Sequence, residues 1–261
     1  MGKHYIGGDW VASRLGKTRA IINPANGETI AEVAEGDRGD ARAAISSARN
    51  AFDYGDWPRA SGAERAGVLR EIAKSVRVQK EELAEFETLD TGKTLEESRW
   101  DMDHVVEVFE FYADLAEQDP REALQSPNPG TTSELIPEPV GVCAMILPWN
   151  YPLVQASWKI APALAAGCTM VVKPSELTPM TTLRLTELIM AAGVPSGVIN
   201  TVLGPGDSVG AELAENHQVD LVSFTGGVTT GKSVMTAAAS TLKRVALELG
   251  MNFIDTSPFY G

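Results

Sequence analysis

The segment Lys159–Pro179, "KIAPALAAGCTMVVKPSELTP", decides the fold. Its first part belongs to a run of small and apolar residues with helical character, predicted to form a helix near residues 155–166. The apolar run Thr169–Val172 that follows is short and predicts a buried strand. Thr178 suits an N-cap and Pro179 the first turn of a second helix, predicted over residues 179–192. The segment is therefore predicted to be a helix–strand–helix unit.

The same alternation continues on both sides of this segment. Further short apolar strands are predicted at Val140–Leu147, Val198–Leu203, Leu221–Phe224 and Arg244–Leu247, with further helices after Gly206 and after Gly231. Strands that alternate with helices at this spacing predict an α/β fold with a doubly wound, Rossmann-like parallel sheet covered on both faces. Ligands bind such sheets at the carboxyl ends of the strands.

The chain divides into four parts. Residues 1–124 contain helical apolar spacing, and Ser61 with Glu64 predicts a capping box, so this part is expected to form an N-terminal helical layer. Residues 125–139, "QSPNPGTTSELIPEP", are too rich in proline for a helix and predict an extended β arm. Residues 140–250 form the Rossmann-like core, and residues 251–261 are an unrelated tail.

Composition excludes several classes of function. The 261 residues carry a formal net charge of −13, which argues against nucleic-acid binding because that depends on clustered Lys and Arg. Cys143 and Cys168 lie in apolar runs, which favours buried reduced thiols, and we predict no metal site. No signal-like segment and no run of about eighteen apolar residues occurs, so a cytoplasmic protein without membrane contact is expected.

Polar and glycine residues follow each predicted strand. Asn150 stands in "LPWNYP", Lys173 and Glu176 stand in "KPSELTP", Gly204 and Gly206 stand in "LGPGDSVG", and Glu248 stands in "LELG". The segment Ser223–Ser233, "SFTGGVTTGKS", also matches the phosphate-binding pattern G-x-x-x-x-G-K-[ST] of NTPases. Together these residues form a group of polar side chains and glycines at consecutive strand ends, where the chemistry is expected.

Residues 5–250 resemble the N-terminal half of an NAD(P)-dependent aldehyde dehydrogenase. The resemblance rests on seven motifs in the family's order: "INPANGETIAEV", "FETLDTGKTLEES", "LPWNYPL", the opening segment, "VPSGVINTVLGPG", "VSFTGGVTTGK" and "LELG". It implies that the turn Gly226–Gly231 and the following helix lie beside the cofactor pyrophosphate. Little chain remains after Ser233 to supply the Mg²⁺ carboxylate of an NTPase, so the NTPase interpretation is disfavoured.

The resemblance also implies roles for individual residues. Asn150 would stabilise the oxyanion, Glu248 would be the general base, and Lys173 with Glu176 would bind the adenosine ribose. A carboxylate repels a 2′-phosphate, so Glu176 favours NAD over NADP. The other residues expected to contact the cofactor are Trp149, Gly204, Gly206, Gly226, Gly227 and Gly231.

The resemblance extends to substrate and assembly. In the betaine-aldehyde and aminoaldehyde branch of the family, aromatic residues at the positions of Tyr151 and Trp158 line the substrate tunnel, where a quaternary ammonium can sit against their rings. Such a pair is also common in ordinary cores. A small aldehyde is therefore the expected substrate, and intact relatives form homo-oligomers.

Two features depart from the family. The chain ends before the position of the family's cysteine nucleophile, so the catalytic domain is expected to be absent and the chain inactive. The tail "MNFIDTSPFYG" resembles an aldo-keto reductase segment, with Asp255 and Tyr260 at the catalytic spacing, although a plain surface tail is the simpler interpretation. A non-catalytic nucleotide-binding or interaction protein built from the same domain is the alternative function.

Overall fold

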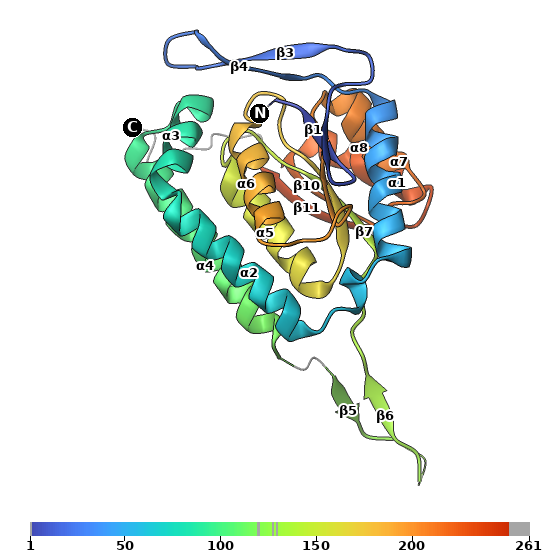
Figure 1. The fold of residues 1–261 in the computed structure, drawn as a ribbon. Helices are drawn as coiled ribbons and strands as arrows, with labels where there is room; N and C mark the ends of the chain where they lie inside the picture. Colours follow the sequence, from blue (N-terminus) through green and yellow to red (C-terminus); the bar gives the residue numbers. More distant parts are fainter. Residues whose placement is uncertain (1, 119–120, 127, 129, 251–261) are drawn as a thin grey trace.

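A computed structural model describes residues 2–118, 121–126, 128 and 130–250 of the chain. In this part a central sheet of seven strands has helices on both faces (Figure 1). The tail that contains Asp255 and Tyr260 lies outside the described residues.

Five parallel strands form most of the sheet, which confirms the predicted α/β class. They are β7 (Val142–Ile146), β8 (Thr169–Lys173), β9 (Ile199–Thr201), β10 (Leu221–Gly227) and β11 (Arg244–Gly250). Their order is β11-β10-β7-β8-β9, so the chain winds one way from β7 to β9 and then returns to the other side of β7. The direction reverses between β7 and β10, and a doubly wound sheet binds ligands beyond its strand ends at such a point.

The sheet is mixed, because two N-terminal strands extend it beyond β9. Strands β1 (His4–Ile6) and β2 (Asp9–Val11) add antiparallel, and β3 (Thr18–Ile22) pairs with β4 (Thr29–Ala34) in a separate hairpin. The helical layer expected over residues 1–124 is thus accompanied by four strands that the sequence analysis did not predict. Strands of three residues are too short to show a period, and β1 is placed by distant contacts such as that of Gly7 N–H with Asn200 Oδ1 at 2.9 Å.

Helices cover both faces of the sheet (Figure 1). One face carries α1 (Arg38–Tyr54), α7 (Ala211–Glu215) and α8 (Val228–Ala239). The other face carries α5 (Pro152–Ala166) and α6 (Met180–Ala191), which are covered in turn by α2 (Gly62–Val78), α3 (Lys80–Thr91) and α4 (Leu95–Ala116). Short turns of 3₁₀ and π helix lie at Trp57–Arg59 and Gly206–Gly210.

Strand side chains alternate between these two helical layers. In β7, Cys143 and Met145 pack toward α5, whereas Val142 and Ala144 pack toward α1. Both faces of the strand are buried, so its sequence is a continuous apolar run rather than an alternating one. Cys143 and Cys168 are free and buried, each 3% exposed, as the sequence led us to expect.

Helix starts show one confirmed and one wrong prediction. Ser61 Oγ accepts the N–H of Glu64 at 3.2 Å, and the Glu64 carboxylate accepts the N–H of Ser61 at 2.7 Å, so the capping box of α2 is confirmed. Thr178 does not cap α6, whose N-cap is Pro179 without a side-chain bond. Its hydroxyl donates instead to the carbonyl of Trp149 at 3.1 Å, because the turn after β8 packs against the turn after β7.

The proline-rich segment forms an arm that leaves the main body (Figure 1). Strand β5 (Glu122–Leu124) pairs antiparallel with β6 (Ser133–Leu135), and both are exposed. The arm begins before the predicted boundary at residue 125, since its first strand already covers Glu122–Leu124. Within the described residues, no helix combines the length and apolar character needed to cross a membrane.

Candidate functional site

Two open clefts lie at the carboxyl ends of the parallel strands. The first cleft, of about 780 Å³, lies between the ends of β7, β8 and β10, the π-helical turn, α7 and α8. The second cleft, of about 890 Å³, lies between α4, the start of α5 and the ends of β10 and β11. The clefts share four lining residues: Pro148, Trp149, Thr225 and Gly226. They therefore meet between β7 and β10, where the winding of the sheet reverses.

Lys173 and Glu176 form a charged pair in the first cleft. Lys173 ends β8 and is only 2% exposed, and its ammonium lies 3.2 Å from the Glu176 carboxylate. Burial lowers the pKa of Lys173, and the charge of Glu176 partly opposes this effect. Burial by itself raises the pKa of Glu176, but Lys173 and hydrogen bonds outweigh it, so that pKa is lowered. The cleft thus presents a fixed carboxylate and ammonium as hydrogen-bonding groups.

The segment Gly226–Gly231 comprises the end of strand β10 and the start of helix α8, and is not the turn that we expected. Strand β10 continues to Gly227, which pairs with Gly250 of β11, and α8 begins at Val228. Gly226 lines both clefts and Gly227 lines the second. Gly231 lies inside α8, where an added Cβ would be 2.5 Å from a methyl carbon of Leu249. Gly231 therefore allows α8 to pack closely on β11, since a larger residue would displace Leu249.

The first turns of α8 border the first cleft. Its N-cap, Gly227, makes no side-chain capping bond, so the first N–H groups of the helix are not satisfied by a cap. Thr229, Thr230 and Ser233 line the cleft. Lys232, the lysine of the NTPase pattern, is exposed and does not line it. The arrangement suits an anion at the helix start and gives no support to an NTPase site.

The turn after β9, which contains Gly204 and Gly206, contributes one of these two glycines to the first cleft. Gly206 begins the π-helical turn and lines the cleft. Gly204 is buried beneath it with φ of +143°, and an added Cβ would lie 2.8 Å from the carbonyl oxygen of Gly36. The positive φ and the close approach to Gly36 require glycine at this position. Gly204 therefore supports the conformation of the loop but does not line the cleft.

The second cleft gathers the polar and aromatic residues predicted to act on a substrate. Asn150 and Tyr151 precede α5, Trp158 stands on α5, and Glu248 stands on β11. The Glu248 carboxylate accepts hydrogen bonds from Gln155 Nε2 at 3.2 Å and from Thr225 Oγ1 at 3.1 Å. These two donors hold an exposed carboxylate at the junction of the clefts.

Sequence analysis did not predict that α4 would line the second cleft. Asp101 and His104 reach it from α4, far from the strand ends in sequence. Their spacing of three residues was the one available signal, since it places both on one face of a helix. The partner of that face was not evident from the sequence.

A buried ion pair between Lys93 and Asp101 supports the wall of the second cleft that α4 forms. Lys93 Nζ lies 2.5 Å from Asp101 Oδ2 and 3.9 Å from the Glu87 carboxylate. It also lies 4.0 Å from the ring centroid of Tyr151. Glu87 in turn accepts the N–H of Leu153 at 3.3 Å, at the start of α5. The network therefore ties the helical layer to the segment that carries Asn150 and Tyr151.

Two carboxyl groups beneath this wall bind their protons more tightly than ordinary carboxyl groups do. Burial raises the pKa of Glu87 to about 7 and that of Asp90 to about 8. Asp90 Oδ2 accepts the N–H of Met180 at 2.8 Å, whereas its buried Oδ1 has no hydrogen-bond partner. A protonated carboxyl suits such surroundings better than a carboxylate.

These raised pKa values predict that stability falls as pH rises. The folded state binds both protons more tightly than the unfolded state, so the stabilisation is complete below about pH 4 and is lost as pH rises through the folded values. Denaturant unfolding at about pH 5 and about pH 9 should show a loss of at least about 1 kcal/mol. Asp90→Asn keeps the acceptor for Met180 and should reduce that loss. An unchanged pH profile in this variant would contradict the assignment to Asp90.

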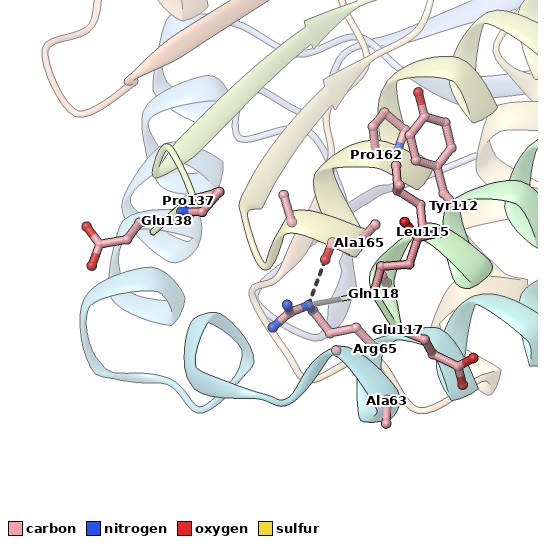
Figure 2. Close-up of a pocket in the computed structure, with 13 residues that line it drawn as sticks. Ala63, Arg65, Tyr112, Leu115, Glu117, Gln118, Pro137, Glu138, Pro162 and Ala165 are labelled. Carbon is pink, nitrogen blue, oxygen red and sulfur yellow. Dashed lines mark hydrogen bonds between the residues drawn. The ribbon is translucent and has the colours of Figure 1, made fainter. Parts of the chain in front are cut away.

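A separate pocket of about 450 Å³ lies between α2, α4, α5 and the segment at Pro137 (Figure 2). Arg65 Nε donates to the carbonyl of Ala165 at 2.7 Å, and Glu117 is bound by Arg70 at 2.7 Å. Arg65 and Glu117 are therefore engaged with neighbouring groups, and the side chain of Glu138 lies apart from both (Figure 2). We place the functional site at the two clefts.

Comparison with known proteins identifies the family of the chain. The sequence profile of the Aldehyde dehydrogenase family matches residues 10–253. Betaine aldehyde dehydrogenase of Bacillus subtilis (strain 168) is 57% identical over 246 residues, which are 94% of this chain and 50% of that protein. Aminoaldehyde dehydrogenase 2 of Zea mays is 46% identical over 252 residues, with the same shares of the two chains.

A crystal structure of betaine aldehyde dehydrogenase from Staphylococcus aureus in complex with NAD⁺ superposes with a TM-score of 0.94 at 52% identity, covering 96% of this chain and 50% of that one. The chain therefore spans about half the length of the relatives it matches. Because the family profile covers most of its residues, the chain belongs to the aldehyde dehydrogenase family.

Proposed function

We propose that this chain is the NAD-binding half of an aldehyde dehydrogenase that oxidises betaine aldehyde or an aminoaldehyde to the acid. The observation that carries the proposal is the meeting of two clefts at Trp149, Thr225 and Gly226. One cleft presents groups suited to a dinucleotide, and the other presents groups suited to an aldehyde. A hydride can pass between two ligands only where their sites adjoin.

The first cleft fits the adenosine and pyrophosphate of NAD. Glu176 accepts hydrogen bonds from ribose hydroxyls, and Lys173 holds that carboxylate in place. The uncapped start of α8 suits the pyrophosphate charge, and Gly206 and Gly226 allow close approach of the backbone. Bound NAD supplies a hydride acceptor. The carboxylate of Glu176 disfavours the additional phosphate of NADP.

The second cleft fits a cationic aldehyde. Asn150 offers an amide that stabilises a developing oxyanion without titrating, and Glu248 offers a carboxylate that takes a proton from water. Tyr151 and Trp158 contribute aromatic rings, and the carboxylate of Asp101, which is paired with Lys93, lines the same cleft. Aromatic rings beside a carboxylate favour an ammonium over a neutral group.

Neither cysteine of the chain is placed to attack an aldehyde. Cys143 and Cys168 are each 3% exposed in the core, and neither lines either cleft. Covalent catalysis in this reaction needs an accessible thiolate. We propose that the 261-residue chain binds NAD but does not by itself oxidise aldehydes.

Absorbance of NADH tests this proposal. The purified chain with NAD and betaine aldehyde or 4-aminobutanal is expected to form no NADH, while calorimetry detects NAD binding. Turnover that disappears in Cys143→Ala or Cys168→Ala would show that one of these thiols reaches the site. Absence of NAD binding would remove the basis of the proposed function.

A non-catalytic nucleotide-binding protein is the second candidate, and the burial of both thiols favours it. It shares the prediction of NAD binding, and any aldehyde-dependent formation of NADH would exclude it. A cytoplasmic location and homo-oligomer formation through the β5–β6 arm stay predictions.

A further inference from the structure

The turn that brings Gly206 into the first cleft is fixed at its base by a side chain from the N-terminal strand β1. Just before the turn, Val202 N–H donates to the carbonyl of Val172 on β8 at 2.9 Å. Leu203 comes next and is buried, and its N–H donates to Nδ1 of His4 at 3.2 Å. The imidazole therefore supplies the acceptor at the position where the pairing of β9 with β8 has ended.

A second contact fixes Leu203 from the other side. The N–H of Gly36, in the loop between β4 and α1, donates to the carbonyl of Leu203 at 3.0 Å. The loop passes so close that a Cβ added to Gly36 would collide with this carbonyl oxygen and with the ring of His4. Gly204 follows directly and packs against the backbone of Gly36. Both backbone polar groups of Leu203 are thus bound by segments that are distant in the sequence.

The tautomer of His4 is set by its surroundings. Because Nδ1 accepts a hydrogen bond, the proton of the neutral ring is on Nε2. Nε2 lies 3.7 Å from the Asp40 carboxylate of α1, which is too long for a hydrogen bond but close enough for electrostatic attraction. Asp40 is itself fixed, since it accepts the N–H of Asp37 at 3.0 Å and that of Arg14 at 3.1 Å. The carboxylate therefore favours the tautomer whose Nδ1 accepts.

The ring of His4 is fully buried and carries no charge at neutral pH. Burial lowers the pKa of His4, and the negative charges of Asp40 and Asp37 oppose this effect only in part. A protonated imidazole has two donors and no acceptor, so it could not bind the N–H of Leu203. The neutral ring keeps its acceptor directed at Leu203.

We propose that His4 is a positioning residue for the cofactor: through Leu203 it keeps the turn with Pro205 and Gly206 in the conformation that lines the first cleft. Without this acceptor the turn would populate other conformations, and affinity falls with the fraction of molecules that keep the binding conformation. This inference rests on the proposed function and gives β1 a role in NAD binding. His4 acts through the backbone and does not contact the ligand.

Calorimetry with NAD at about pH 7.5 compares the wild-type chain with two variants. His4→Leu removes the acceptor and is expected to weaken NAD binding at least about 5-fold, because the N–H of Leu203 is left without its partner. His4→Asn places an amide oxygen near the position of Nδ1 and should restore the affinity to within about 2-fold of wild type. Wild-type affinity in His4→Leu, or an equal loss in both variants, would overturn the proposal.

Thr169→Val is the matched control for the loss of a buried hydrogen bond. Thr169 begins β8 at the end of the sheet opposite the clefts, and its hydroxyl donates to the carbonyl of Ala48 at 2.9 Å. This variant should lower the midpoint of thermal unfolding and leave NAD affinity unchanged. A loss of NAD affinity as large as that in His4→Leu would show a general effect of destabilisation and would contradict the positioning role.

Imidazole ¹⁵N spectra of the wild-type chain test the same contact without a destabilising substitution. The signals of His4, assigned with His4→Asn, should show an unprotonated Nδ1 and a protonated Nε2 at about pH 7.5. A protonated Nδ1 would overturn the proposal whether or not His4→Leu folds. Failure of the wild-type chain to bind NAD would instead reject the proposed function, so the two failures are distinguishable.

Discussion

Lys93→Met is expected to lower the free energy of unfolding by about 3 kcal/mol or more at neutral pH. The side chain of Lys93 is 4% exposed and that of Asp101 is 13% exposed, so removal of the ammonium leaves a carboxylate that water reaches poorly. Removing one partner of a buried pair costs far more than the pair contributes. For a chain of this size the midpoint of thermal unfolding should fall by roughly 6 °C or more.

An exposed pair between α3 and α4 serves as the control. Lys80 Nζ lies 2.7 Å from Asp103 Oδ2, with side chains 30% and 56% exposed. Lys80→Met should cost about 1 kcal/mol or less, because water screens this pair. The double variant Lys93→Met with Asp101→Leu should recover most of the loss, since no carboxylate is then left without its partner. Equal effects of Lys93→Met and Lys80→Met would show that the buried pair has no special role.

Glu176→Ala is expected to weaken NAD binding by about 10- to 100-fold, the value of losing hydrogen bonds to a charged group. The variant removes the acceptor for the ribose hydroxyls and also the charge that lies 3.2 Å from the Lys173 ammonium. Calorimetry with NAD measures the effect. Glu176→Gln should keep part of the NAD affinity and improve NADP binding, because the amide does not repel a 2′-phosphate.

Glu187→Ala is the matched control for the cofactor experiment. Glu187 stands on α6, the helix that follows the Lys173–Glu176 turn, where it pairs with Arg184 at 2.5 Å. The substitution makes the same change of charge outside the first cleft and should leave NAD affinity unchanged. Unchanged NAD binding in Glu176→Ala, or tighter binding of NADP than of NAD by wild type, would contradict the assignment of this carboxylate to the ribose.

The parallel core could be predicted because its signals are local. Strands such as β7 and β8 are buried on both faces and therefore appear as unbroken apolar runs, which helices separate at regular intervals. The rule that parallel strands end at one edge of the sheet then brought Lys173 and Glu176 into the first cleft and Asn150 and Glu248 into the second. Each step needed only neighbouring residues and the geometry of the sheet.

The boundary between β10 and α8 was beyond such reasoning. Glycine allows both an open turn and a strand end, so the segment Gly226–Gly231 has no local preference. Pairing with β11 extends β10 to Gly227, and α8 starts directly afterwards because Gly231 fits against Leu249. The end of β10 is therefore set by its hydrogen bonds to β11, a strand that comes later in the chain.

What the sequence by itself determined is the order of strands and helices and the polar groups at the strand ends. Tertiary structure alone decided that β1 and β2 join the sheet, and that α4 brings Asp101 and His104 beside Trp158. The physical reason is the range of the interactions. Burial and periodicity can be recognised in the types of consecutive residues. The partner of an exposed helix face or of a three-residue strand is instead set by packing between segments that are distant in the sequence.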